Sequence, residues 1–133
     1  MKEAVIVGGV RTPIGRAGER GVYRNITGRE LTIPVVQELL KRTGVDPNLV
    51  EDFFLGTVGQ PGFWARNMLI EMGLPHSIGA IAVNRWCASS LQAIAQAAGF
   101  IAMDMADVII AAGAETDGRV GPVGAGSRAT AWR

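Results

Sequence analysis

The feature that most constrains the fold is a strand, a lone cysteine and a helix in direct succession between residues 80 and 105. Residues 80–86 (AIAVNRW) are mostly apolar and include β-branched side chains, so they predict a short strand. After Cys87 the apolar residues recur with the 3.6-residue period of a helix and would form one continuous stripe. The stripe consists of Leu91, Ile94, Ala95, Ala98, Ile101, Ala102 and Met105. Cys87 is therefore expected at a strand-to-helix turn.

The helix predicted over Ser89–Met103 carries almost no charge, because the side opposite the apolar stripe offers only glutamines, a glycine and a phenylalanine. A helix that lacks a charged face is typical of a protein interior. We expect this helix to be buried on nearly its whole circumference, between two layers of secondary structure.

The position of the only cysteine has a chemical consequence. The free N–H groups and aligned peptide dipoles at a helix amino end favour a negative charge, so the thiolate is favoured over the thiol. Cys87 is then a candidate nucleophile, more reactive than an ordinary buried thiol. The alternative is a small and inert core residue, since free cysteine is among the most buried residue types. The residue types by themselves leave both interpretations open.

Residues 83–94 (VNRWCASSLQAI) resemble the acyl-enzyme cysteine signature of the thiolases, the acetyl-CoA acyltransferases, at every position of that pattern. Other stretches are also similar to this family: VIVGGVRTPIG at residues 5–15, ARN at 65–67 before GLP at 73–75, and ADVIIAAGAET at 106–116. The resemblance covers Glu3 to Arg119 and only the amino-terminal part of a thiolase. It favours thiolase over the other condensing enzymes of the superfamily.

The resemblance implies a thiolase-type acyltransferase in which Cys87 carries the acyl group of acetyl-CoA or a 3-ketoacyl-CoA as a thioester. Coenzyme A would be part of the substrate, with no cofactor and no metal. The catalytic histidine, the acid/base cysteine and most coenzyme A contacts of the family have no counterpart here, so the chain is expected to be inactive alone. A complementary carboxyl-terminal half is an expected partner.

The resemblance also implies a homo-oligomer formed through the strand Ala80 to Trp86, with Trp86 and Phe63 as aromatic anchors. In this family the segment around Arg66 and Asn67 lies near the partner subunit, which makes them candidate interface residues; an ordinary exposed polar pair is the alternative. Two other functions stay open. One is a non-catalytic, truncated thiolase-like module for dimerisation or binding, and the other is a fragment of a related condensing enzyme.

Composition excludes several classes of function. The net charge of the 133 residues is only +1, which argues against a nucleic-acid partner or an anionic membrane surface. No run approaches the roughly 20 apolar residues of a membrane span. A single cysteine permits no internal disulfide, which is compatible with a cytoplasmic protein.

The remaining elements complete an α/β pattern. Strands are predicted over residues 3–10, 52–58 and 107–112, and helices from Thr32 to Arg42 and from Phe63 to Met72. Their alternation predicts a layered half-domain over residues 1–117, with a mostly parallel mixed sheet. The glycine-rich residues 118–133 predict an irregular or disordered tail.

Two further titratable residues are candidates for a role near Cys87. His76 lies in a loop before the strand at 80–86, and we expect no catalytic task for it because nothing places it within hydrogen-bond reach of the thiol. Glu115 follows the last strand and is expected near the carboxyl ends of the strands, where it would support the loop around Cys87.

Overall fold

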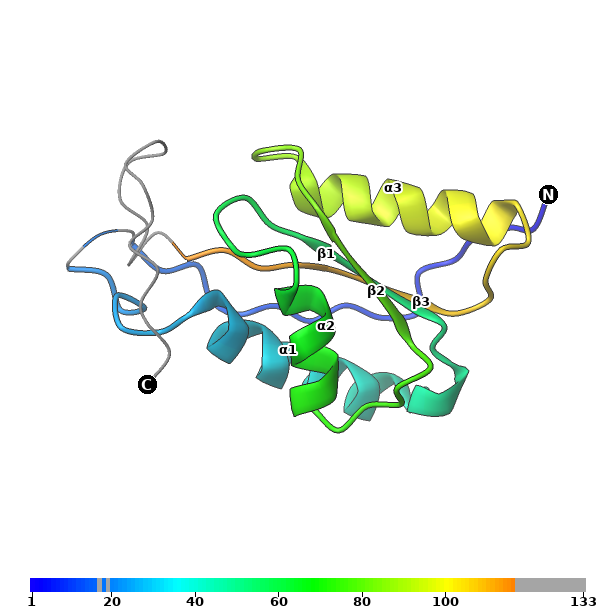
Figure 1. The fold of residues 1–133 in the computed structure, drawn as a ribbon, viewed down its shortest axis with the longest axis horizontal. Helices are drawn as coiled ribbons and strands as arrows, with labels where there is room; N and C mark the ends of the chain where they lie inside the picture. Colours follow the sequence, from blue (N-terminus) through cyan, green and yellow to red (C-terminus); the bar gives the residue numbers. More distant parts are fainter. Residues whose placement is uncertain (17, 19, 117–133) are drawn as a thin grey trace.

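The computed structural model describes residues 1–16, 18 and 20–116 and contains a three-stranded sheet with helices on both faces (Figure 1). The strands are β1 (Asp52–Gly56), β2 (Gly79–Val83) and β3 (Ile109–Gly113). The helices are α1 (Gly28–Thr43), the short 3-10 helix η1 (Pro47–Leu49), α2 (Trp64–Glu71) and α3 (Ser89–Ala102). Helix α3 covers one face of the sheet, and α1 and α2 cover the other (Figure 1). This layered arrangement confirms the predicted α/β fold class.

The strand order is β2-β1-β3, and both strand pairs are parallel. The antiparallel member of a mixed sheet is not present among the described strands. Asp52 is level with Gly79 and Ile109, and Gly56 is level with Val83 and Gly113. Because the three strands begin and end together, the loops that follow them emerge at one edge of the sheet. Cys87 belongs to this edge.

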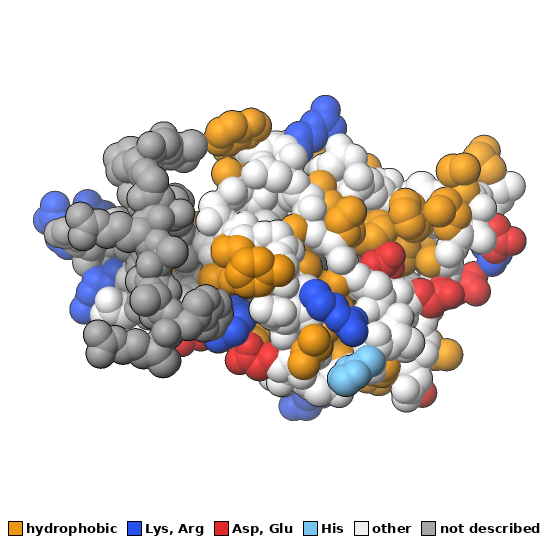
Figure 2. Space-filling model, in the orientation of Figure 1, with side chains coloured by type: hydrophobic (Ala, Val, Ile, Leu, Met, Phe, Trp, Pro, Cys, Tyr) orange, Lys and Arg blue, Asp and Glu red, His pale blue; other side chains and the backbone are white. Residues whose placement is uncertain are grey.

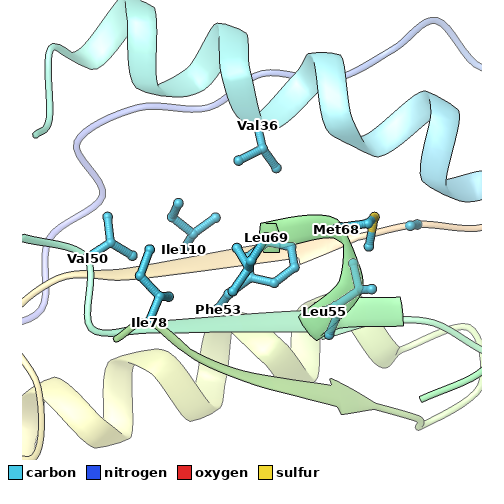
Figure 3. Packing of buried hydrophobic residues seen from close by; sticks show 10 residues of the cluster. Val36, Val50, Phe53, Leu55, Met68, Leu69, Ile78 and Ile110 are labelled. Atoms are coloured by element: carbon cyan, nitrogen blue, oxygen red, sulfur yellow. The ribbon is translucent and has the colours of Figure 1, made fainter. Parts of the chain in front are cut away.

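Helices α1 and α2 enclose the larger of two hydrophobic clusters (Figure 3). Successive side chains of a strand point to opposite faces, and Phe53 and Leu55 of β1 both point to this side. The buried members are Val36, Val50, Phe53, Leu55, Ala65, Met68, Leu69, Ile78, Ile110 and Ala114. Burial of each large apolar side chain contributes about 1.5–3 kcal/mol, so this cluster is the main source of stability.

Helix α3 packs on the other face through small residues. Ala93 and Ala97 are buried against Phe54, whose ring meets that of Phe100 edge-on with 5.1 Å between centroids. Most of the stripe predicted to be buried is instead exposed: Leu91 and Ile94 show 67% and 44% of their surface, and Ile101 is half-buried. Figure 2 shows hydrophobic side chains along the surface over α3. Burial of nearly the whole circumference is therefore not found in this chain.

Glycines in the sheet explain which side of α3 is buried. A Cβ atom added to Gly56 would lie 2.4 Å from the Ser90 nitrogen, and one added to Gly113 would lie 2.7 Å from the Ser90 Cβ. Such distances are far shorter than normal van der Waals contacts, so only glycine at these two positions lets α3 lie this close to the sheet. The side of α3 with the smallest residues thus faces the sheet, and its larger residues point away.

Helix α1 begins earlier than predicted. Thr27 and Glu30 form a complete capping box, in which each side chain bonds the backbone N–H of the other residue. The helix therefore starts at Gly28 and includes Pro34, whereas the sequence favoured a start at Thr32 to keep the proline near the end. The two bonds of the capping box help to offset the hydrogen bond that Pro34 cannot make.

The strand predicted over residues 3–10 is not formed. The segment is extended but unpaired, and Val5, Ile6 and Val7 are exposed. Its apolar run has strand propensity, but strand pairing depends on tertiary context, and among the described residues only β1, β2 and β3 form the sheet. The predicted tail at 118–133 lies outside the described residues. Among the helices that are described, none has the length and hydropathy needed to cross a membrane.

Candidate active site

Cys87 lies between β2 and α3, as the sequence predicted. It follows the end of β2 at Val83 and precedes the first residue of α3, Ser89, by two positions, with Ala88 as the N-cap residue. The thiol-bearing residue is exposed and takes no part in either hydrophobic cluster. This exposure contradicts the interpretation of Cys87 as a small core residue. Its reactivity as a nucleophile stays a prediction.

The backbone directly before Cys87 is strained. Trp86 has a φ of 52°, in the left-handed region that bulky side chains seldom adopt. Such a conformation costs on the order of 1–3 kcal/mol and persists only where surrounding contacts impose it. One of these contacts is the 3.1 Å hydrogen bond from the Trp86 N–H to the Asn84 Oδ1.

Ser89 holds the same turn from the helix side. Its Oγ accepts a hydrogen bond from the Arg85 N–H at 2.9 Å and donates one to the Trp86 carbonyl at 2.6 Å. The Ser89 N–H donates to the same carbonyl at 3.0 Å. Residues on both sides of Cys87 are therefore fixed by hydrogen bonds, of which the side-chain bonds of Ser89 are partly buried, while the cysteine itself is exposed. Sequence reasoning missed these roles of Asn84 and Ser89, although both residue types commonly bond to nearby backbone.

Glu115 supports the loop that follows β1. Its Oε2 accepts hydrogen bonds from the N–H groups of Val58 at 2.8 Å and Gly59 at 2.9 Å, and its Oε1 accepts one from the Gln60 Nε2 at 3.0 Å. Burial, the largest single influence, acts to raise the pKa of Glu115, but these hydrogen bonds together outweigh it and lower the pKa. The carboxylate is thus stabilised in its charged form. Its direct contact is with residues 57–60, not with the Cys87 turn.

The other candidates of the sequence analysis lie away from Cys87. His76 precedes β2 at its amino end and is exposed, whereas Cys87 follows the carboxyl end of that strand. Arg66 donates to the carbonyls of Ile78 at 2.7 Å and His76 at 3.0 Å, so it holds the loop that leads into β2. Asn67 is exposed on α2. The structure places none of these three side chains beside the thiol.

The amino-acid sequence around this site also matches the model of a known protein family. Residues 4–124 match the model described as thiolase, N-terminal domain. The chain belongs to the thiolase family. The resemblance seen in residues 83–94 is thereby confirmed, and so is its restriction to the amino-terminal part of a thiolase.

Curated relatives are thiolases as well. The 3-ketoacyl-CoA thiolase of Shewanella baltica is 45% identical over 125 residues, which are 90% of this chain and 32% of that thiolase. The 3-ketoacyl-CoA thiolase of Shewanella loihica is 44% identical over the same shares. The chain therefore spans about a third of the length of the curated thiolases it matches.

Solved thiolase structures share the fold. The acetyl-CoA acetyltransferase of Bacillus anthracis has a TM-score of 0.82 and 32% identity, and the match covers 100% of this chain and 35% of that one. The Acat5 thiolase of Ascaris suum, solved in complex with coenzyme A, has a TM-score of 0.71 and 30% identity, covering 79% of this chain and 28% of that one. The thiolase-like fold predicted from the sequence is confirmed.

Proposed function

We propose that this chain is the acyl-carrying part of a thiolase, in which Cys87 takes the acyl group of acetyl-CoA or a 3-ketoacyl-CoA as a thioester. The observation that carries the proposal is the exposed thiol in a strained turn, held from both sides and placed just before α3. Backbone strain of this kind is concentrated at functional sites. The names of the relatives, 3-ketoacyl-CoA thiolase and acetyl-CoA acetyltransferase, support the substrate class.

The acyl transfer balances without any other reagent. With acetyl-CoA, the Cys87 thiolate attacks the thioester carbonyl, a bond forms between the Sγ and the carbonyl carbon, and the bond from that carbon to the sulfur of coenzyme A breaks. The departing thiolate takes up a proton from water, which balances the proton that the Cys87 thiol gave up to water on ionising. Coenzyme A enters as part of the substrate, and the proposal requires no separate cofactor and no metal. The single cysteine is compatible with the cytoplasmic location that we propose.

Turnover needs a proton carrier beside the thiol and an acceptor held in position. The single histidine, His76, lies beyond the other end of β2, and the chain has no second cysteine. We therefore propose that these 133 residues by themselves load an acyl group but do not catalyse thiolysis or condensation. Acetoacetyl-CoA thiolysis at an ordinary enzymatic rate, abolished by Cys87→Ser, would refute this part.

Two surfaces support the proposed partners. Strand β2 is an edge strand with Ile81 exposed, and the aromatic residues Trp86 and Phe63 expose 63% and 54% of their surface. An open edge with apolar neighbours favours pairing with a second copy of the chain. On α3, the exposed apolar side that includes Leu91 and Ile94 is the proposed docking face for a complementary carboxyl-terminal half.

Mass spectrometry after incubation with acetyl-CoA tests acyl loading. We expect the mass of one acetyl group on the chain, located on the peptide that contains Cys87 and released by hydroxylamine. The Cys87→Ala variant should gain no hydroxylamine-sensitive mass. Acetylation at lysines alone, equal in the two proteins, would contradict the proposal.

Light scattering at micromolar concentration tests the partner surfaces, with a dimer or larger species expected. An Ile81→Lys variant should shift the species toward monomer, because it places a charge on the proposed pairing edge. If the chain dimerises and binds coenzyme A but never carries an acyl group, the non-catalytic module is the correct function. A folded monomer with no shift upon substitution would exclude the proposed edge contact.

A further inference from the structure

Two side chains join the three loops at the carboxyl edge of the sheet. Glu115, after β3, binds the N–H groups of Val58 and Gly59 in the loop after β1. Asn84, after β2, donates through its Nδ2 to the Val58 carbonyl at 3.3 Å. The loop of the central strand is therefore held by a side chain from each neighbouring strand. Val58 is common to both contacts.

The same Asn84 side chain continues to the residue before the cysteine. Its Oδ1 accepts the Trp86 N–H at 3.1 Å, and Trp86 is the residue with the left-handed backbone. A continuous series of contacts thus leads from the Glu115 carboxylate through Val58 and Asn84 to the turn of Cys87. Each step is a hydrogen bond with no solvent molecule between the two partners.

We propose that Glu115 is a positioning residue for Cys87, which acts through Val58 and Asn84 to hold the turn that presents the thiol. The proposal rests on the proposed function of Cys87 as the acyl carrier and deepens it. Without the carboxylate, the N–H groups of Val58 and Gly59 lose their acceptor and the loop after β1 shifts. Asn84 then loses its fixed anchor, and the strained Trp86 backbone relaxes toward an ordinary conformation.

A second carboxylate provides a matched control. Glu51 also accepts hydrogen bonds from the backbone, namely from the N–H groups of Asp107 and Val108, and it is exposed. It binds at the amino edge of the sheet, at the opposite end from Cys87. Loss of Glu51 removes a comparable side chain to backbone contact without touching the turn. The two glutamates therefore separate a general effect on folding from a specific effect on the cysteine.

The test is the rate of Cys87 alkylation by iodoacetamide at one fixed pH, in chains whose folding is checked by circular dichroism. Glu115→Ala and Asn84→Ala should each slow alkylation by at least about twofold, the lower limit of energetic coupling between residues in contact. The double variant should be no slower than the slower single variant, because both act through one series of contacts. Glu115→Gln keeps one carbonyl oxygen as an acceptor and should recover most of the rate, whereas Glu51→Ala should alkylate as the unmodified chain does.

Additive losses in the double variant would overturn the proposal, and so would an unchanged rate in Glu115→Ala or an equal loss in Glu51→Ala. If Glu115→Ala does not fold, the same cycle is run with Asn84→Ala and Glu115→Asp, whose shorter side chain withdraws the carboxylate from the Val58 and Gly59 N–H groups. Alkylation needs no acyl-CoA, so the result is independent of acyl loading. A chain that shows the coupling but takes no acetyl group would refute the proposed function and leave the positioning role intact.

Discussion

The two faces of the sheet differ in how they are packed. On the α1 and α2 side, large residues such as Phe53, Leu55 and Met68 interlock and are almost completely buried. On the α3 side, contact is made largely by alanine, serine and glycine, and the Phe54 and Phe100 rings and Ile109 add bulk. The first face excludes more apolar surface from water, whereas the second brings a helix backbone close to the strands.

The two faces therefore have different roles: the α1 and α2 face stabilises the fold, and the other face fixes the position of α3. Hydrophobic stabilisation grows with the apolar area removed from water, so the α1 and α2 face supplies most of it. The close approach of α3 fixes the height of its amino end relative to Gly56 and Gly113. The Cys87 turn is continuous with that end. We therefore expect substitutions on the first face to affect unfolding, and substitutions on the second to affect the cysteine as well.

The largest effect on stability is expected for Phe53→Ala, which empties the centre of the α1 and α2 cluster. Phe53 is 0% exposed, and replacing a buried phenylalanine by alanine costs about 3–5 kcal/mol through lost burial and the cavity left behind. This loss of unfolding free energy is measured by urea unfolding, followed by circular dichroism at a fixed protein concentration. A loss below about 1 kcal/mol would mean that the cluster is not the main source of stability.

Gly56→Ala tests the close approach of α3. The new Cβ would meet backbone atoms of Ser89 and Ser90, which cannot move without shifting the helix, so the expected loss is about 1–3 kcal/mol. Cys87 alkylation should change in the same variant. The control is Gly99→Ala on α3, where the added Cβ would point into open space and the substitution should be neutral or stabilising. Equal behaviour of the two variants would contradict close packing at Gly56.

A smaller effect is expected on the outer side of α3. Leu91→Gln removes an apolar side chain that is 67% exposed, and surface changes of this kind stay within about ±0.5 kcal/mol. Ala97→Leu, on the buried side of the same helix, should overpack the contact with the sheet by about 1–3 kcal/mol. The urea midpoints of the two variants give the ratio of their losses in unfolding free energy. A large loss in Leu91→Gln alone would show that this side is already covered in solution.

The smallest effect is the pH dependence that Glu115 contributes. Its pKa is lowered in the folded chain, so its stabilisation is complete above the unfolded value of about 4.3 and is lost as the pH falls through the folded pKa. Glu115→Gln cannot titrate there. The difference in unfolding free energy between the two proteins should therefore shrink as the pH falls below the unfolded pKa and through the lower folded pKa of Glu115. A difference in unfolding free energy that grows as the pH falls would contradict a lowered pKa of Glu115 in the folded chain.

Local patterns predicted the elements that depend on neighbouring residues. The Cys87 turn and the strand that begins at Asp52 both follow from spacing and residue type, and the structure has each of them. The predicted helix start at Thr32 is wrong, because the capping box of Thr27 and Glu30 begins α1 at Gly28 with Pro34 inside the helix. When two local effects on a helix have free energies of similar size, the spacing of residues alone does not show which of them is larger.

The remaining errors concern contacts between distant segments. The prediction that the apolar stripe of α3 is buried is wrong, because periodicity identifies an apolar side but not how closely a helix can approach a sheet. That distance is decided by Gly56 and Gly113, which lie beneath Ser90. For Glu115 a supporting role was foreseen from its place after the last strand. Its acceptance of the Val58 and Gly59 N–H groups required the folded loop.

The central place of β1 also sets an order in time. Its two partners both come later in the chain: Asp52 pairs with Gly79 on one side and with Ile109 on the other. Parallel pairings over such sequence separations form slowly, because a long loop must close before any contact rewards it. We therefore expect the sheet to close with β3, which brings in Glu115 as the last strand forms. On this order the turn of Cys87 becomes fixed only in the final step of folding.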